Sequence, residues 1–429
     1  MVTLKEENNS LLAAIKSKWF YLLCIFVLGL GIRMIGLRYG SPLLVHSDEE
    51  NVVKSALWFD PDTGFERVAM NRPAQVQIEM HALMYRVYSY LRWQEPLLEN
   101  FFLEELRYYV AGRFLNAVMG ALIPIAAFLV GKQFKPDFSM PAAILFCLYP
   151  SYIKHSHFIS PDIHTALWTL MVMLFAIRYA KGVGKYSLWL AVFFVAVNTA
   201  DKYPGIISAA LVLGALILRF SDESKKTGSF DKAGFAKTAL KCFGAFFLFL
   251  FLVAPNIYIN FDGVIKALIH QSNPIDLASD GLTYFQLVPK FMWYFFHFLN
   301  WFLTVFVIAG FVGLIVIKDK TAILLLYGFL YLLLMSVLGK DLERWALPMY
   351  VSPLLIGAFG VSWLFERLAK KPVVLLAAKL VFIAGLALLA LAGISESLVL
   401  SLPDTRVVAI PYLEENGITE NNSYFDGFT

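Results

Sequence analysis

Two neighbouring carboxylates stand shortly after the first long apolar run of the chain. Asp48 and Glu49 lie in the segment His46-Ser47-Asp48-Glu49-Glu50, beyond the apolar run that ends near Leu37. An ionisable group beside hydrocarbon is costly, so this acidic pair is a candidate site. A carboxylate there can accept a proton as a general base or belong to an ion gate. The structural alternative is a helix start, where Ser47 caps the backbone and the acids favour the helix dipole.

Three basic residues at turns are candidates for holding an anion. They are Arg72 in Asn71-Arg72-Pro73, Lys202 in Asp201-Lys202-Tyr203-Pro204, and Arg344 in Glu343-Arg344-Trp345. An arginine fork can grip a phosphate with two hydrogen bonds, and a lysine can hold it as a point charge. The alternatives are an arginine at the lipid headgroup level for Arg72, pairing with Asp201 for Lys202, and a solvated turn for Arg344.

Arg113 and Asp162 add a second acid and a buried cation. Arg113 falls one turn inside an apolar segment, where a guanidinium needs a partner, and Asp162 is the expected one. Asp162 follows Ser160-Pro161, which is also ordinary chemistry for a helix start. His155 and His157 are two residues apart, a spacing that permits a metal site without requiring one.

Composition places these residues in a membrane protein. The chain has 429 residues, of which 59% are hydrophobic and 16% charged. Soluble domains carry about 25% charged and 45–50% apolar residues. The net charge of +4 gives no indication of nucleic-acid binding, and the three cysteines lie in apolar segments without metal-ligand spacing. The sequence therefore predicts an all-α integral membrane protein.

Long apolar runs predict about eleven transmembrane helices, because a span needs about 20 apolar residues. The first run has no small-residue cleavage site, so it reads as an uncleaved span. The expected spans are 19–38, 109–130, 140–153, 162–180, 186–200, 203–219, 238–255, 291–317, 321–339, 345–365 and 373–397.

These spans imply one polytopic domain over residues 1–397 and a short extracytoplasmic tail over 398–429. Residues 39–108 form a long polar first loop between spans. Helical spacing of its less polar positions predicts amphipathic helices on the membrane surface; these positions are Ile78, Ala82, Tyr85 and Ser89. The tail is expected to be the start of a strand or a disordered end.

Alternate turns between the spans are basic, which predicts their orientation because positive loops stay cytoplasmic. A cytoplasmic N-terminus puts the following residues inside: Lys132, Lys135, Arg178, Lys181, Lys185, Lys225, Lys226, Lys232, Lys237, Lys241, Lys318, Lys320, Arg367, Lys370 and Lys371. The first loop, the site candidates and the C-terminus are then extracytoplasmic. We expect a multi-pass protein of the cell membrane with its site on the outer face.

The ordered set of motifs resembles the GT-C superfamily of membrane glycosyltransferases that use polyprenyl-phosphate sugars. Within it, the chain looks like the protein-mannosyltransferase and lipid A aminoarabinose-transferase branch. The family often has a second proline where Ala74 follows Pro73. The matching segments are His46-Ser47-Asp48-Glu49, Arg72-Pro73, Ala111-Gly112-Arg113-Phe114-Leu115-Asn116, Ser156-His157-Phe158-Ile159-Ser160-Pro161-Asp162, Lys202-Tyr203-Pro204-Gly205 and Glu343-Arg344-Trp345-Ala346-Leu347-Pro348.

The resemblance implies direct displacement at the anomeric carbon of a polyprenyl-phosphate-sugar donor by an acceptor hydroxyl. Asp48 takes the family's place of the general base, and Glu49 is grouped with it as catalytic. The donor phosphate would be held by the three cations at turns: Arg72, Lys202 and Arg344.

Arg113 and Asp162 would order the site, while the acceptor is an unknown protein, lipid or glycan. Some members of the family bind a divalent metal and others need none, so a metal ion is compatible with the resemblance. The candidate ligands would be Asp48, Asp162 and His157.

Two other classes of membrane protein would also place charges among helices. A transporter or lipid flippase would spread them through the bilayer depth, often at helix breaks near the midplane. Here they gather at turns on one side. An acyltransferase would need a histidine or serine nucleophile system, and His81, His155, His157 and His297 form no such motif. The sequence therefore favours a glycosyltransferase.

Overall fold

The structure is a computed structural model that describes residues 18–44, 46–57, 74–92, 97–272, 284–337 and 342–418. Over these ranges the regular elements are helices and no strand occurs, which confirms the predicted all-α class. The α-helices are α2 (Lys18–Met34), α3 (Ser47–Leu57), α4 (Gln75–Arg92), α5 (Leu97–Leu103), α6 (Glu105–Gly131), α7 (Pro136–Leu148), α8 (Pro150–His155), α9 (Asp162–Ala180), α10 (Ser187–Asp201), α11 (Ala209–Thr227), α12 (Lys232–Val253), α13 (Asn256–Ile259), α14 (Phe261–Ser272), α15 (Tyr284–Leu299), α16 (Trp301–Val316), α17 (Tyr327–Val337), α18 (Leu347–Leu368), α19 (Pro372–Ser401) and α20 (Thr405–Glu415), and the 3-10 helices are η2 (Tyr203–Ser208), η4 (Lys320–Leu326) and η5 (Glu343–Ala346).

Several of these helices can cross a membrane by length and apolar character. In the described part of the chain, six helical segments qualify, or seven if the bent pair of α15 and α16 counts as one span. Four shorter apolar segments of 10–17 residues accompany them: Trp19–Met34, Pro136–Leu148, Ser187–Asp201 and Lys320–Ser336. The multi-pass architecture is therefore confirmed, whereas the predicted number of about eleven spans is not.

Two predicted spans are broken in the structure. The run 140–153 divides into α7 and α8 at Tyr149, which is extended and precedes Pro150. Proline disfavours a helical conformation in the residue before it, so the break follows from Pro150. The run 291–317 divides at Asn300, whose φ of 59° is left-handed and whose side chain caps α16 by accepting from the Leu303 amide. The helix direction turns by 119° between the two parts of this bent pair.

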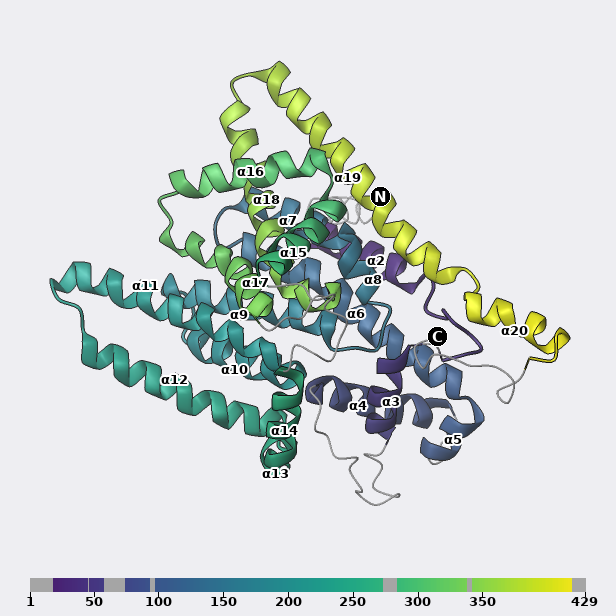
Figure 1. Cartoon of the computed structure of the whole chain (residues 1–429). Coiled ribbons are helices and arrows are strands. Elements are labelled where there is room, and N and C mark those ends of the chain that lie inside the picture. The colour runs from purple at the N-terminus through teal and green to yellow at the C-terminus, as the bar shows by residue number, and fades with distance from the viewer. Residues whose placement is uncertain are drawn as a thin grey trace, which may run out of the picture.

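The packed centre of the molecule is built on α6, α7, α9, α16 and α18. Within α18, 89% of the apolar window is buried, against 11% in α12 and in α19. Gly310 of α16 and Gly360 of α18 let these two helices touch, because an added Cβ on either would overlap the facing backbone. The exposed leucines and phenylalanines of α12, at the edge of the bundle in Figure 1, suit contact with acyl chains.

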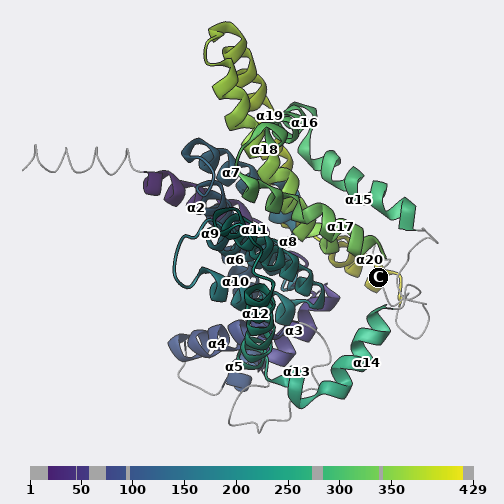
Figure 2. The same cartoon turned by 90° about the vertical axis from the view of Figure 1, so that its left-hand side faces the viewer.

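The first loop contributes helices, as predicted. α3, α4 and α5 lie together at one end of the bundle (Figure 1), and the second view keeps them there (Figure 2). The predicted face of α4 is buried at Ile78, Ala82, Tyr85 and Ser89. This face packs against α3, α5 and α6 within a small core of its own. The helices therefore form a cap on the bundle through protein contacts.

The described part of the C-terminal tail, residues 398–418, is helical, and the rest of the predicted strand or disordered end lies outside the described residues. α19 continues to Ser401, and α20 follows after a short turn. Asp404 caps α20 by accepting a hydrogen bond from the Arg406 amide at 2.9 Å. The cap favours α20 because the aspartate satisfies one of the unpaired amides of its first turn.

Candidate functional site

Glu49 and Arg113 form a buried ion pair at the start of α3. Both side chains are fully buried, and Arg113 Nη2 donates to Glu49 Oε2 at 2.7 Å. The guanidinium Nε also donates to Glu49 Oε1 at 3.0 Å, so the contact is bidentate. The Ile159 amide donates to the same Oε1 at 2.9 Å. Glu49 therefore joins α3 to α6 and to the turn before α9.

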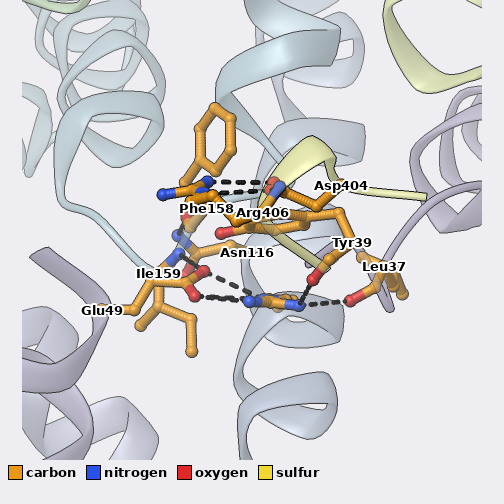
Figure 3. Close-up of polar contacts among 9 residues, drawn as sticks. Leu37, Tyr39, Glu49, Asn116, Phe158, Ile159, Asp404 and Arg406 are labelled. Carbon is orange, nitrogen blue, oxygen red and sulfur yellow. Dashed lines mark hydrogen bonds and ion pairs between the residues drawn. The ribbon is translucent and has the colours of Figure 1, made fainter. Parts of the chain in front are cut away.

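The remaining donors of Arg113 hold the connection between α2 and α3. Its Nη1 donates to the carbonyls of Leu37 at 2.9 Å and Tyr39 at 3.1 Å, as the dashed lines of Figure 3 show. The guanidinium carbon also lies 3.7 Å from the centre of the Tyr39 ring. The predicted pairing of Arg113 with Asp162 is wrong. Arg113 instead anchors the backbone on which the acidic segment stands.

Glu49 was grouped with the catalytic residues, and its surroundings do not fit that role. Its carboxylate is enclosed by Arg113 and the Ile159 amide and has no exposed surface. A base must reach the proton that it removes. The surroundings of Glu49 therefore fit a residue that holds α3 in position, whereas the Asp48 side chain is 38% exposed.

Asp48 forms an ion pair with Arg344, across 296 residues of sequence. Asp48 lies in the first turn of α3 and Arg344 in η5, just before α18. Their side chains are 38% and 29% exposed, so this pair is open to solvent and to a ligand. Two residues that the sequence places in one site are thus in contact.

A second ion pair lies beside the first. Lys202, directly after α10, pairs with Asp162, the first residue of α9, and both are buried. The Lys202 ammonium also lies 3.7 Å from the centre of the Trp345 ring, and Trp345 follows Arg344 in the chain. Arg344 is close enough to act electrostatically on Asp162 and Lys202. Four of the predicted residues therefore form one cluster of alternating charge: Asp48, Arg344, Asp162 and Lys202.

Glu343 attaches η5 to α8. Its carboxylate accepts from Lys154 at 3.0 Å and Ser151 at 2.5 Å, and His155 Nε2 lies 3.8 Å away. We predicted only the cation of the Glu343-Arg344 pair as a site residue. In the sequence, Glu343 is marked only by its place beside Arg344. Its contacts with α8 hold η5 in position, and so also hold the backbone of Arg344.

Asp201 is the centre of a buried network that sequence reasoning missed. Its carboxylate accepts from the Gln77 amide at 2.8 Å and from Trp168 Nε1 at 2.6 Å. His164 Nδ1 lies 3.4 Å from the same carboxylate, and His164 Nε2 lies 3.2 Å from Asn116 Oδ1. The network ties α4 to α6, α9 and α10, and its signal in the sequence is an acid next to Lys202.

His46 packs close to the Glu49 pair, against the turn that precedes α9. Its ring stacks on Phe158 with 4.7 Å between ring centres. Burial lowers the pKa of His46 below its ordinary value, although Glu49 and Asp48 act in the opposite direction. His46 is therefore neutral at neutral pH and adds no charge to the cluster.

A cavity of about 410 Å³ opens between the α2–α3 connection and the tail. Arg38, Tyr39 and Asp404 are among its lining residues. Asp404 and Arg406 appear with Tyr39 in the close-up of Figure 3. The backbone that Arg113 holds from one side thus borders open space on the other.

Two further residues were predicted for the site, Arg72 as a phosphate ligand and His157 as a metal ligand. Arg72 lies outside the described residues. The ring nitrogens of His157 lie 2.9 Å and 2.8 Å from the carbonyls of Ile153 and Ile35, which leaves neither free to ligate a metal. Among the residues that the structure describes, no three His, Cys, Asp or Glu side chains are grouped to hold a metal ion. The set Asp48, Asp162 and His157 therefore does not fit a metal centre.

Comparison with known proteins confirms the resemblance to the GT-C membrane glycosyltransferases. Residues 93–270, less than half of the chain, match the dolichyl-phosphate-mannose-protein mannosyltransferase family. No curated protein matches significantly over its sequence.

The fold is shared with the archaeal oligosaccharyltransferase AglB of Archaeoglobus fulgidus. Its complex with an inhibitory peptide and a dolichol-phosphate aligns with a TM-score of 0.54 at 14% identity, over 94% of this chain and 59% of that one. The apo form gives 0.58 at 12% identity, over 95% and 59%. The complex with Zn and sulfate gives 0.56 at 11% identity, over 94% and 57%. The chain thus spans less than two thirds of these relatives.

Proposed function

We propose that the chain is a membrane glycosyltransferase that moves a sugar from a polyprenyl-phosphate-linked donor to an acceptor hydroxyl at the extracytoplasmic face. The contact between Asp48 and Arg344 carries the proposal. It puts a carboxylate that can serve as base beside a cation that can hold a phosphate, in a chain with a GT-C fold. The mannosyltransferase match supports the class of donor.

The proposed reaction is one displacement at the anomeric carbon. The acceptor oxygen forms the new bond to that carbon and passes its proton to Asp48. The bond between the anomeric carbon and the donor phosphate oxygen breaks, and the electron pair leaves with the polyprenyl phosphate. Arg344 and Lys202 offset the charge that grows on this phosphate, as preorganised cations do. The acceptor is a hydroxyl of a protein, lipid or glycan.

The same contact suggests how substrate prepares the base. Arg344 is paired with Asp48 in the structure. A phosphate beside Arg344 offers the guanidinium a bidentate partner, which releases the Asp48 carboxylate. Glu49 and Arg113 keep α3 in place during this exchange because their own contacts are complete.

Nothing in the comparisons favours the transporter or flippase alternative. The charged cluster also gathers where α3, α9 and η5 begin and α10 ends, and not midway along the helices. A transport site would be expected near the bilayer midplane. The enzyme reading accounts for the clustering directly.

The test is a donor screen with the purified full chain in lipid. Polyprenyl-phosphate sugars are offered one at a time with peptide, lipid and glycan acceptors, and released polyprenyl phosphate is measured. Asp48→Asn is expected to lower turnover on the active donor by about 10²–10⁴-fold, the usual value of a general base. The matched control is Asp222→Asn. Asp222 is another part-exposed aspartate, which lies on α11 and pairs with Lys320 of η4.

Absence of release with every donor would overturn the proposed reaction. Undiminished release by Asp48→Asn would remove Asp48 from the mechanism while leaving the enzyme class intact. Equal losses in Asp48→Asn and Asp222→Asn would show damage to folding, so the unfolding temperature of each variant is measured alongside.

A further inference from the structure

A second cavity, of about 610 Å³, lies at the opposite end of α18 from the candidate site. It is bordered by the start of α7, the end of α16 and the end of α18, through residues such as Lys135, Ile317 and Arg367. A volume of this size is within the range of about 300–1,000 Å³ that holds small ligands. The proposed reaction uses none of its residues.

The position of this cavity is that of a membrane interface. α18 has 22 residues and begins one residue after η5, which carries Arg344. A helix of that length spans about 33 Å, close to the hydrocarbon thickness of about 30 Å. If Arg344 lies at one interface, the end of α18 therefore reaches the other. Figure 2 shows α18 running along the length of the bundle.

The cavity lining has an excess of positive charge. Lys135, Lys318, Arg367 and Lys370 contribute four cations, against the single carboxylate of Glu366. That carboxylate already accepts from Lys135 at 2.6 Å. Three cations of the lining remain, and no ion pair joins them to an acid within the described ranges.

The nearest acid in sequence is also engaged elsewhere. Asp319 follows Lys318, but its carboxylate accepts from Lys181 at 2.5 Å and from the Thr321 amide at 3.0 Å. The Asp319 carboxylate is therefore occupied by Lys181 and Thr321 and does not neutralise the cations of the cavity. Lys318, Arg367 and Lys370 thus line an open space whose one carboxylate, Glu366, is already paired with Lys135.

The inner wall of the cavity is apolar. Phe359, Trp363 and Val316 line it beside Gly313, and an added Cβ on this glycine would press on both aromatic rings. The Arg367 guanidinium lies 5.6 Å from the centre of the Trp363 ring. Tryptophan and arginine at this level are typical of the border between headgroups and acyl chains. The cavity thus offers cations to a phosphate and an apolar wall to a chain.

We propose that this cavity binds an anionic phospholipid, with its phosphate held by Lys318, Arg367 and Lys370. The acyl chains run along the apolar wall toward the bilayer. Basic pockets between membrane helices hold such headgroups, and each lysine near the surface adds to the attraction. A free phosphate shares the charge but has no use for Phe359 and Trp363. The lipid would clamp the ends of α16 and α18 together at the face away from the proposed reaction.

The experiment measures lipid retained by the purified full chain in nanodiscs of equal phosphatidylglycerol and phosphatidylcholine. Native mass spectrometry after release counts the lipids bound to each protein. Wild-type protein is expected to retain phosphatidylglycerol preferentially. Lys318→Gln with Lys370→Gln is expected to weaken that retention by about ten- to thirtyfold.

A control variant carries Lys226→Gln with Lys232→Gln. Both lysines are exposed and lie at the α11–α12 connection, outside the cavity, so the net charge changes equally. Retention should stay at the wild-type value. Unfolding temperature in phosphatidylcholine alone verifies that each variant is folded.

Equal retention by the cavity variant and wild-type protein would overturn the proposal. An equal loss in the control would overturn it too, because the effect would then follow net charge. Inorganic phosphate, added to protein in phosphatidylcholine, distinguishes the sources. If it raises the unfolding temperature as much as phosphatidylglycerol does, the site is one for free phosphate and the lipid assignment fails.

Discussion

Two acidic neighbours on α3 are bound to two arginines in contrasting surroundings. Glu49 and Arg113 are both fully buried, with a bidentate contact supported by main-chain groups. Asp48 and Arg344 are 38% and 29% exposed. A buried ion pair costs desolvation, and breaking it leaves an uncompensated charge. A part-exposed pair contributes little to stability and can change partners.

The difference separates structure from chemistry within one helical turn. Consecutive residues on a helix point about 100° apart. Glu49 can therefore be fully buried while Asp48 stays partly exposed. The buried pair fixes α3 against α6, and the part-exposed pair is the one that the proposed reaction uses. Neither role can be read from Asp48 or Glu49 as residue types alone.

The largest expected effect breaks the buried pair. Arg113→Leu leaves the Glu49 charge buried without its partner and should lower the free energy of unfolding by about 3–5 kcal/mol. Thermal unfolding of the purified protein in lipid measures the change. Arg107→Leu, on the same helix and in an exposed contact with Glu104, is the control with little expected loss.

A double variant tests whether the loss comes from the orphaned charge. Glu49→Leu with Arg113→Leu removes both charges and should be more stable than Arg113→Leu alone. If the double variant is the less stable of the two, the ion pair is not the cause. The different effects of Arg113→Leu and Arg107→Leu on stability would then come from packing.

The open pair should show the reverse behaviour. Arg344→Gln is expected to lower transfer from the donor by about 10²–10³-fold, the cost of losing one preorganised group at a developing charge. Its free energy of unfolding should change by less than about 1 kcal/mol, because the pair is part-exposed. Steady-state transfer and thermal unfolding are measured on the same preparation. A large loss of stability with unchanged transfer would reverse the assignment of the two pairs.

Acid should destabilise the protein by protonating His81, which is fully buried like the Glu49–Arg113 pair. Burial on α4 lowers the pKa of His81 from 6.5 to about 4. Between these values the unfolded chain binds a proton that the folded chain does not. Stability therefore falls as the pH drops from about 6.5 to about 4, by about 3 kcal/mol in total.

His81→Leu should flatten this acid limb. Unfolding free energy is measured at intervals from pH 7 to pH 4 for both proteins. His46, whose pKa is also lowered, remains in the variant, so part of the slope persists. Identical slopes in the two proteins would contradict the assignment to His81.

The smallest effect belongs to a fully solvated pair on α3. Glu50 pairs with Lys54 one turn further along, and both side chains are more than half exposed. Glu50→Gln should change the free energy of unfolding by about 0.3–0.5 kcal/mol and leave transfer unaffected. A greater loss would mean that exposure does not separate the three acids of this helix.

Much of this arrangement was predictable, and its pairings were not. Charges at turns of an apolar chain marked Asp48, Asp162, Lys202 and Arg344 because such residues are costly near a bilayer. The predicted partner of Arg113 was wrong. Glu49 and Asp162 are both expected on the same side of the membrane, and their positions in the sequence do not tell which of them is nearer to Arg113. The Asp201 network was missed because its partners are ordinary residues of separate helices. The break at Asn300 was missed because left-handed backbone has no strong signal in an asparagine.

The long sequence separation of Asp48 and Arg344 has a consequence for biosynthesis. The acid enters the membrane early in translation, whereas its cation emerges only after most of the helices have been inserted. A nascent chain that ends before Arg344 therefore lacks one partner of this ion pair, and the proposed site is incomplete. The Asp48–Arg344 pair, and with it the proposed site, can form only when the last third of the polypeptide has folded against α3.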